Sequence, residues 1–248
     1  MMTEFIRLRQ AATDPGLLLR PIQETLLADD YAWRMASGLL PEEFQTDSEI
    51  VQKIRTYRTS HVPPKFIAIR DLLLQILGGN EKAIIWTIFV QNAKNLQTYL
   101  HAAGYNVELL IGEVDQPSRE IIVRKFNDPQ DSDFRIVIAN PFAVSESISL
   151  HKGCHNAIYL ERDYNCASFL QSKDRIHRYG LLPDQPTNYY YTISIDSVDE
   201  IIDDRLSEKI RRMERIIDDE IPLFSRLDDL DETDIITSLI EDYARRTQ

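Results

Sequence analysis

The amino-acid sequence predicts an α/β fold built around a mostly parallel sheet, and three observations support this prediction. Between residues 65 and 195, short apolar runs alternate with longer segments of helical periodicity. The first run, Ala83–Phe89, is continuously apolar, which is typical of a strand covered on both faces. Glycines end the helical segments, and strands that alternate with helices form βαβ units with right-handed crossovers.

The predicted elements follow one another in a regular order. The strands are expected at Ala83–Phe89, Asn106–Ile111, Arg135–Ala139, Asn156–Leu160 and Asn188–Ile195. The helices before and between them are expected at Phe66–Leu77, Asn92–Ala103, Ser118–Phe126 and Cys166–Tyr179. Gly78, Gly104 and Gly180 follow three of these helices, and Pro117 suits the first turn of the helix that begins beside it.

Helical segments are expected on both sides of this domain. A short helix, Phe5–Ala12, ends at Asp14-Pro15-Gly16, and residues 24–64 are typical of helical pieces and connectors. After Asp196, apolar residues recur at helical spacing as far as Ile217, and a last helix is expected from Thr233 to Arg246. The chain is therefore predicted to comprise a helical lead-in at 1–64, an α/β domain at 65–195 and a helical extension at 196–248.

Negative charge is concentrated in the extension. The chain has a net charge of −12, and the segment from Asp196 to the end holds 17 acidic and 8 basic residues. This segment is expected to be a solvated helical brace packed on the domain, with a docking surface for a protein partner as the alternative. An acidic protein binds polyanions poorly in general, so any contact with DNA must come from a local basic surface.

Compartment and metal content follow from simple features. The N-terminus lacks a secretory signal, no apolar stretch approaches the roughly 20 residues of a membrane helix, and the two cysteines form no disulfide framework, so we expect a cytoplasmic protein without membrane contact. His151, Cys154 and His155 form an H-x-x-C-H cluster, but Cys166 is the only other cysteine. A closed zinc site needs four ligands, so we expect no metal and give this cluster a loop or core role.

The segment Gln171–Gly180 carries the most informative chemistry. Arg175 and Arg178 are three residues apart, so both are expected on one face of a helix. Two guanidinium groups can hold a polyphosphate and stabilise the charge on a transferred γ-phosphoryl group, and Gln171 lies one turn upstream. From spacing alone, a solvated basic helix face, with Asp174 paired to Arg178, is the simpler interpretation.

Four sequence blocks then occur in the order typical of one protein family. They are Lys82–Val90, Gly112–Phe126, Ile138–Leu150 with the following HKGCHNAIYLERDYN, and Gln171–Gly180, which has the pattern Gln-x-x-x-Arg-x-x-Arg-x-Gly. From about Phe5 to Leu206, the chain resembles the second motor lobe of superfamily-two helicase-like ATPases of the Swi/Snf type. FIRLRQAATDPGLL and Pro64-Lys65-Phe66 resemble the segments that precede this lobe.

The resemblance implies a RecA-like, three-layer αβα domain that acts on ATP bound elsewhere. Arg175 and Arg178 would face the γ-phosphate of ATP with Mg²⁺, held mainly by a separate P-loop lobe in the same or another chain. Gln171 would support that contact. Glu146 and Ser147, where the family often has Gly-x-Gly, would approach the nucleotide.

The resemblance also implies contacts with double-stranded DNA. Thr87 and Arg119, at a strand end and a helix start, would contact phosphates, and Asn140 and Phe142 would contact the DNA backbone. Asn140–Phe142 stands where the family often has Ser-Thr-Arg, so a hydroxyl and a positive charge are replaced, and Pro141 has no N–H.

The chain lacks the groups that would let it hydrolyse ATP alone. It has 8 glycines, none in the spacing of a P-loop, and no Asp-Glu run that would hold Mg²⁺ follows a strand. We therefore expect half of a helicase-like translocase, inactive by itself, and either a fragment or a split subunit. Two alternatives remain open: a non-catalytic RecA-like interaction module, and an RNA-directed helicase lobe.

Overall fold

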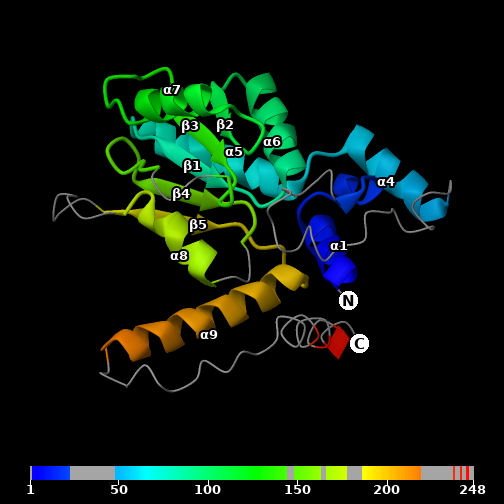
Figure 1. Ribbon diagram of the computed structural model, residues 1–248. Coiled ribbons are helices and arrows are strands. Elements are labelled where there is room, and N and C mark those ends of the chain that lie inside the picture. Colours follow the sequence, from blue (N-terminus) through cyan, green and yellow to red (C-terminus); the bar gives the residue numbers. More distant parts are fainter. Residues whose placement is uncertain are drawn as a thin grey trace.

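A computed structural model describes residues 2–22, 48–143, 148–162, 166–177 and 186–218, together with residues 237, 241, 244 and 245. The described residues form a five-stranded sheet in the order β2-β3-β1-β4-β5 (Figure 1). All four strand pairings are parallel, which confirms the predicted fold class. The strands are β1 (Ala83–Trp86), β2 (Val107–Leu110), β3 (Ile136–Ala139), β4 (Asn156–Tyr159) and β5 (Asn188–Tyr191).

Each strand is shorter than the sequence predicts, and the largest difference is at β5. We expected this strand to continue to Ile195, but it ends at Tyr191. Thr192 still donates its N–H to the carbonyl of Tyr159 over 3.1 Å. Because β4 ends at Tyr159, the residues after Thr192 have no neighbouring strand with which to pair, and Ile195 is 80% exposed.

Helices cover both faces of the sheet, as in a RecA-like three-layer domain. Helices α5 (Pro64–Gly78) and α6 (Val90–Ala102) pack on one face, and α7 (Gln116–Phe126) and α8 (Cys166–Asp174) pack on the other. Side chains of β1 alternate between these two layers: Ile85 faces α5 and α6, and Trp86 faces α7 and α8. Burial on both faces explains why the strands are continuously apolar.

The N-terminal lead-in packs at the carboxyl ends of the strands. It comprises α1 (Met2–Thr13), a 3-10 helix η1 (Pro15–Leu19) and, after residues that are not described, α4 (Glu49–Ser60). Asp14 caps η1 by accepting the N–H of Gly16 over 2.8 Å. Ile6 and Leu17 pack against Phe89, which follows β1. The expected short helix and its end at Asp14 are confirmed.

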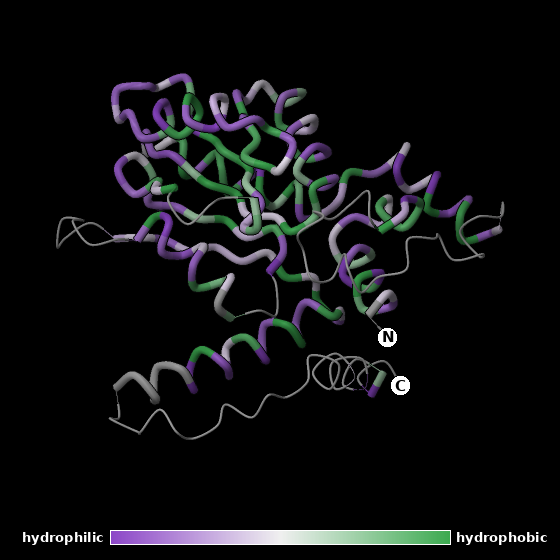
Figure 2. Tube along the Cα trace, in the orientation of Figure 1, coloured by the Kyte–Doolittle hydropathy of each residue, from purple (hydrophilic) through white to green (hydrophobic). Residues whose placement is uncertain are grey.

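The long helix expected after Asp196 is present as α9 (Val198–Asp218), which runs beside α8 (Figure 1). Its apolar residues recur along the helix (Figure 2), and Ile201 and Leu206 are buried. Asp199 forms an ion pair of 2.5 Å with Lys65 of α5, and only 5% of the lysine side chain and 11% of the aspartate side chain are exposed. The beginning of this acidic extension is therefore part of the packed lobe. Most of the expected last helix lies outside the described residues.

Cys154 has a core position. Its side chain is fully buried, and its Sγ donates to the carbonyls of Lys82 and Asn156. Burial raises the pKa of the Cys154 thiol to about 12. In the described parts of the chain, no three His, Cys, Asp or Glu side chains gather as metal ligands. In those same parts, every helix is too short or too polar to cross a membrane.

Candidate nucleotide and nucleic-acid interface

The described site residues lie mainly in loops that follow the carboxyl ends of the strands. Thr87 follows β1 and Asn140 follows β3, and these two strands are neighbours in the sheet. Arg119 lies in the first turns of α7, after β2. Ligands of open α/β sheets bind at this edge, near the strand where the order of the sheet reverses. Here that strand is β1, between β3 and β4.

A buried carboxylate organises the loop after β1. Glu161, just after β4, accepts hydrogen bonds from Thr87 Oγ1 (2.6 Å), the Ile88 N–H (3.2 Å) and Asn92 Nδ2 (2.6 Å). Burial raises the pKa of Glu161, and these hydrogen bonds and nearby Lys65 act in the opposite direction. Neither Glu161 nor Asn92 is among the site residues predicted from the sequence. The signal that could have found Glu161 is an acidic residue placed directly after an apolar strand.

We expect the stability difference between wild type and Glu161→Gln to change with pH. Burial raises the pKa of Glu161 in the folded chain above its ordinary value of 4.5, so the folded state favours the protonated carboxyl group. Glu161 therefore contributes most to the free energy of unfolding, relative to the variant, below pH 4.5. This contribution is lost as the pH rises through the raised pKa that Glu161 has in the folded chain. Urea denaturation across pH measures this difference, with Glu120→Gln on the exposed side of α7 as control. A difference that stays constant with pH would contradict the expectation.

Asn140 joins three loops at the carboxyl ends. Its N–H donates to the carbonyl of Leu110 at the end of β2 (3.1 Å), and its Nδ2 donates to the carbonyl of Ile88 (2.9 Å). Its Oδ1 accepts the N–H of Phe142 (2.9 Å), which folds part of the segment Ile138–Leu150 into a turn. This segment resembles the fifth motif of the helicase-like ATPases and is called the fifth-motif segment below. Thr87 and Asn140 are both fully buried. Both side chains form hydrogen bonds within the lobe, and their contact with DNA stays a prediction.

Arg119 holds the loops that follow β2 and β3. Its Nε donates to the carbonyl of Val114 (2.7 Å), and its Nη2 donates to the carbonyls of Ile111 and Gly112 (both 3.0 Å). Its Nη1 reaches the carbonyl of Ala143 over 3.0 Å. The guanidinium group thus donates hydrogen bonds to four backbone carbonyls, and its role as a DNA contact stays a prediction.

Arg175 does not lie on a helix, contrary to the prediction that a helix continues to Tyr179. Helix α8 ends at Asp174, and Arg175 lies in the following turn. The chain leaves regular α-helical hydrogen bonding here, because the N–H groups of Arg175 and Ile176 donate to carbonyls three residues back, and the Arg175 carbonyl accepts the N–H of Leu150 over 2.9 Å. Arg175 is only 6% exposed, and its Nη1 lies 3.4 Å from the carbonyl of Ile148. Arg178 is outside the described residues.

Two predicted site arginines therefore hold the two flanks of the fifth-motif segment. Arg119 binds the carbonyl of Ala143 on one side, and Arg175 lies beside the carbonyl of Ile148 on the other. Residues 144–147, which include the predicted Glu146 and Ser147, lie between these flanks and outside the described residues. Among the remaining site residues, Phe142 packs against Ile88, Phe89 and the lead-in helices, and Gln171 is exposed on the last turn of α8.

Comparison with known proteins places this site in a family. The helicase conserved C-terminal domain matches residues 64–180. Human lymphoid-specific helicase is 25% identical over 176 residues, which are 71% of this chain and 19% of that protein. Helicase SWR1 of Candida glabrata is 27% identical over 220 residues, which are 84% of this chain and 15% of that protein. The chain thus spans less than a fifth of the length of these relatives.

A solved structure shares the fold. The crystal structure of the C-terminal part of the Fun30 ATPase domain matches with a TM-score of 0.63 and 22% sequence identity, over 97% of this chain and 80% of that one. The matched family segment contains β1 to β4, Glu161 with its hydrogen-bond partners, and the block Gln171–Gly180, which resembles the sixth motif of the helicase-like ATPases. Residues 64–180 are therefore a helicase conserved C-terminal domain, and the chain has a RecA-like fold and is similar in sequence to Swi/Snf-type helicases.

Proposed function

We propose that this chain is the C-terminal half of a DNA-translocating ATPase, and that it acts on ATP held by a separate P-loop lobe. The observation that carries the proposal is the sixth motif, Gln171–Gly180. This motif keeps its glutamine, both arginines and its glycine inside the matched helicase domain, in a sequence that has no P-loop. An intact γ-phosphate-facing motif without a phosphate-binding loop is what one half of a two-lobed motor requires.

The donors of this chain fit a contact to the γ-phosphate and do not make a complete nucleotide site. Glu161 is buried and its two carboxylate oxygens accept three hydrogen bonds, so it does not offer them to Mg²⁺. ATP with Mg²⁺, when bound by the other lobe, supplies the phosphoryl group that is transferred. We assign Arg178 and Arg175 to neutralise the charge that develops on the γ-phosphoryl oxygens, with Gln171 supporting them. Glu146 and Ser147 would relay the nucleotide state to the fifth-motif segment.

We assign DNA contact to the loops after β1, β2 and β3. Arg119 and Asn140 fix the backbone of these loops, so the loops need little reorganisation when they meet a phosphate backbone. Thr87 supports the first loop through Glu161, and Phe142 stands at the start of the fifth-motif segment. Contacts of this kind recognise the backbone and not the bases, so binding is expected to vary little with sequence and strongly with salt.

The proposal is tested by reconstitution. DNA-stimulated ATP hydrolysis is measured for the chain joined to its cognate P-loop lobe, for the two lobes mixed, and for each lobe alone. We expect turnover only when both lobes are present, because opening and closing of the two lobes couples hydrolysis to stepping. A P-loop lobe that hydrolyses ATP equally well alone would contradict the proposal and favour an interaction module. Stimulation by RNA and not by DNA would favour an RNA-directed lobe.

A further inference from the structure

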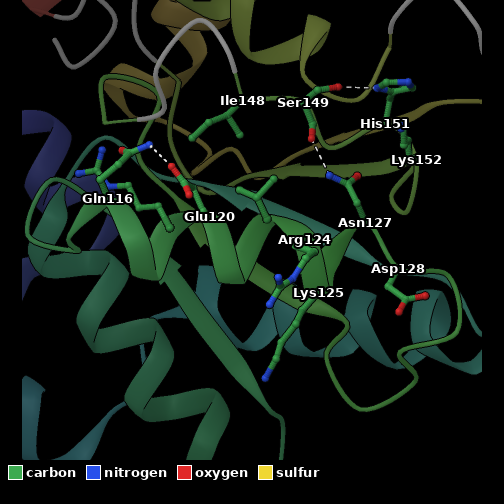
Figure 3. Close-up of a pocket in the computed structure, with 12 residues that line it drawn as sticks. Gln116, Glu120, Arg124, Lys125, Asn127, Asp128, Ile148, Ser149, His151 and Lys152 are labelled. Carbon is green, nitrogen blue, oxygen red and sulfur yellow. Dashed lines mark hydrogen bonds between the residues drawn. The ribbon is translucent and has the colours of Figure 1, made fainter.

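A groove with a volume of about 770 Å³ runs along the outer side of α7, from Gln116 and Arg119 at the start of the helix to Asn127 and Asp128 at its end. Figure 3 shows that its walls come from α7 on one side and from the segment with Ile148, Ser149, His151 and Lys152 on the other. The two walls are tied together by Asn127, whose Nδ2 donates to the carbonyl of Ser149 over 2.7 Å. The groove is thus a feature of the packed lobe and not a gap between loosely associated segments.

The groove collects positive charge on a chain that is negative overall. Four basic side chains line it, together with two carboxylates, those of Glu120 and Asp128, whereas the whole chain has a net charge of −12. Arg119 is committed to backbone carbonyls. The remaining cations, which are exposed and form no ion pair with the described residues, are Arg124, Lys125 and Lys152.

Three cations on other helices of the described surface are paired with carboxylates. Lys53, Arg70 and Lys94, on α4, α5 and α6, each form an ion pair with a carboxylate: Glu49, Asp71 and Glu113, respectively. The helix dipole favours basic residues in the last turn of a helix, which accounts for Arg124 and Lys125 but not for Lys152, because Lys152 comes from a different segment. A shared groove is what brings the three groups together.

The character of the groove indicates an extended polyanion. Its cations are exposed, so they attract anions by releasing counterions and not by enclosing a small desolvated ligand. Side chains that donate neutral hydrogen bonds, such as Gln116 and Ser149, stand beside them. Helix α7 starts after β2, at the edge where Arg119 holds the carboxyl-end loops. The groove therefore continues from the proposed DNA-binding edge along the side of the sheet.

We propose that this groove is a second contact for the phosphate backbone of duplex DNA, made by Arg124, Lys125 and Lys152. The proposal rests on the proposed function for its choice of duplex DNA as the polyanion. It concerns residues to which the family resemblance assigns no role, and it gives a lobe with an acidic extension a local basic surface. Because the three cations contact phosphates and no base edges, they add affinity without adding sequence preference.

The test measures binding of the full 248-residue chain to a fluorescent duplex of about 30 base pairs, by anisotropy, between about 50 and 200 mM salt. Arg124→Gln, Lys125→Gln and Lys152→Gln are combined in one variant. Lys53→Gln, Arg70→Gln and Lys94→Gln form a control that loses the same charge on other faces. None of the six side chains is buried, so both variants are expected to fold, which thermal denaturation checks.

We expect the groove variant to bind at least about tenfold more weakly than the control. The slope of log affinity against log salt should become less steep by about 0.9 for each cation that contacts a phosphate. Equal loss in the groove and control variants would assign the effect to net charge and overturn the proposal, as would wild-type binding by the groove variant. Preferential, groove-dependent binding of RNA would overturn duplex DNA as the ligand. If reconstituted ATP hydrolysis is intact while the groove variant binds DNA normally, the groove proposal fails and the motor proposal stands.

Discussion

Replacing Arg178 by alanine is expected to slow DNA-stimulated ATP hydrolysis by on the order of 10³-fold or more when the chain works with a P-loop lobe. The physical reason is that the guanidinium group neutralises charge that appears on the phosphoryl oxygens only as the bond breaks, so its loss falls mainly on kcat. Steady-state kinetics at saturating DNA and ATP measure the effect. The matched control is Arg211→Ala, which removes an exposed arginine of α9. Turnover within about twofold of wild type would remove Arg178 from the site.

The neighbouring arginine separates a structural effect from a chemical one. Arg175 is buried, its Nη1 lies 3.4 Å from the carbonyl of Ile148, and its own carbonyl accepts the N–H of Leu150. Arg175→Ala is therefore expected to lower stability by about 1–3 kcal/mol in addition to any loss of turnover. Arg178→Ala is expected to lower turnover alone. Urea denaturation of both variants, beside the kinetics, shows which loss is due to unfolding.

Replacing Gly153 by alanine is expected to destabilise the lobe by about 3 kcal/mol, at the upper end of ordinary overpacking. A Cβ at this position would lie 2.2 Å from the carbonyl oxygen of Phe126 and 2.9 Å from the Cα of Asn127. Both atoms belong to the backbone at the end of α7, so no side-chain rotation relieves the clash. Either the segment from Ile148 to Gly153 or the end of α7 must move.

Gly78 provides the matched control for this change. It is the last residue of α5, and a Cβ built there meets no atom within 4 Å. Gly78→Ala is therefore expected to leave stability unchanged or to raise it by up to about 1 kcal/mol, because alanine loses less conformational entropy in a helix. The midpoints of urea unfolding at constant slope give both values. If Gly153→Ala is as stable as Gly78→Ala, the tight packing of this loop on α7 is refuted.

The layers and the element order could be predicted from the sequence because they depend on local patterns. A continuously apolar strand such as Ala83–Trp86 and an amphipathic helix such as α9 each carry their signal within one segment. The ends of the helices and strands could be predicted less well from the sequence. Helix α8 ends at Asp174, and in the turn that follows, the Arg175 carbonyl accepts the N–H of Leu150, 25 positions away. No sequence pattern within Cys166–Tyr179 predicts this hydrogen bond between Leu150 and Arg175.

The candidate site shows the same division. Its motif residues could be predicted from their order in the chain, but their partners could not. The position of Arg119 at a helix start is typical of a phosphate-binding arginine. In the structure its guanidinium group donates hydrogen bonds to carbonyls of the loops after β2 and β3. Glu161 could not be predicted because a single acidic residue has no periodicity. Its structural role depends on hydrogen bonds from Thr87 and Asn92, about 70 positions earlier in the chain.

The Lys65–Asp199 pair also bears on how far this chain can be shortened without losing stability. A chain cut at residue 195 would keep the lysine ammonium in its enclosed position and remove the only carboxylate paired with it among the described residues. We therefore expect a stable fragment of this chain to include the first turns of α9. If the motor opens and closes as proposed, this first part of the acidic extension moves with the lobe as one rigid body.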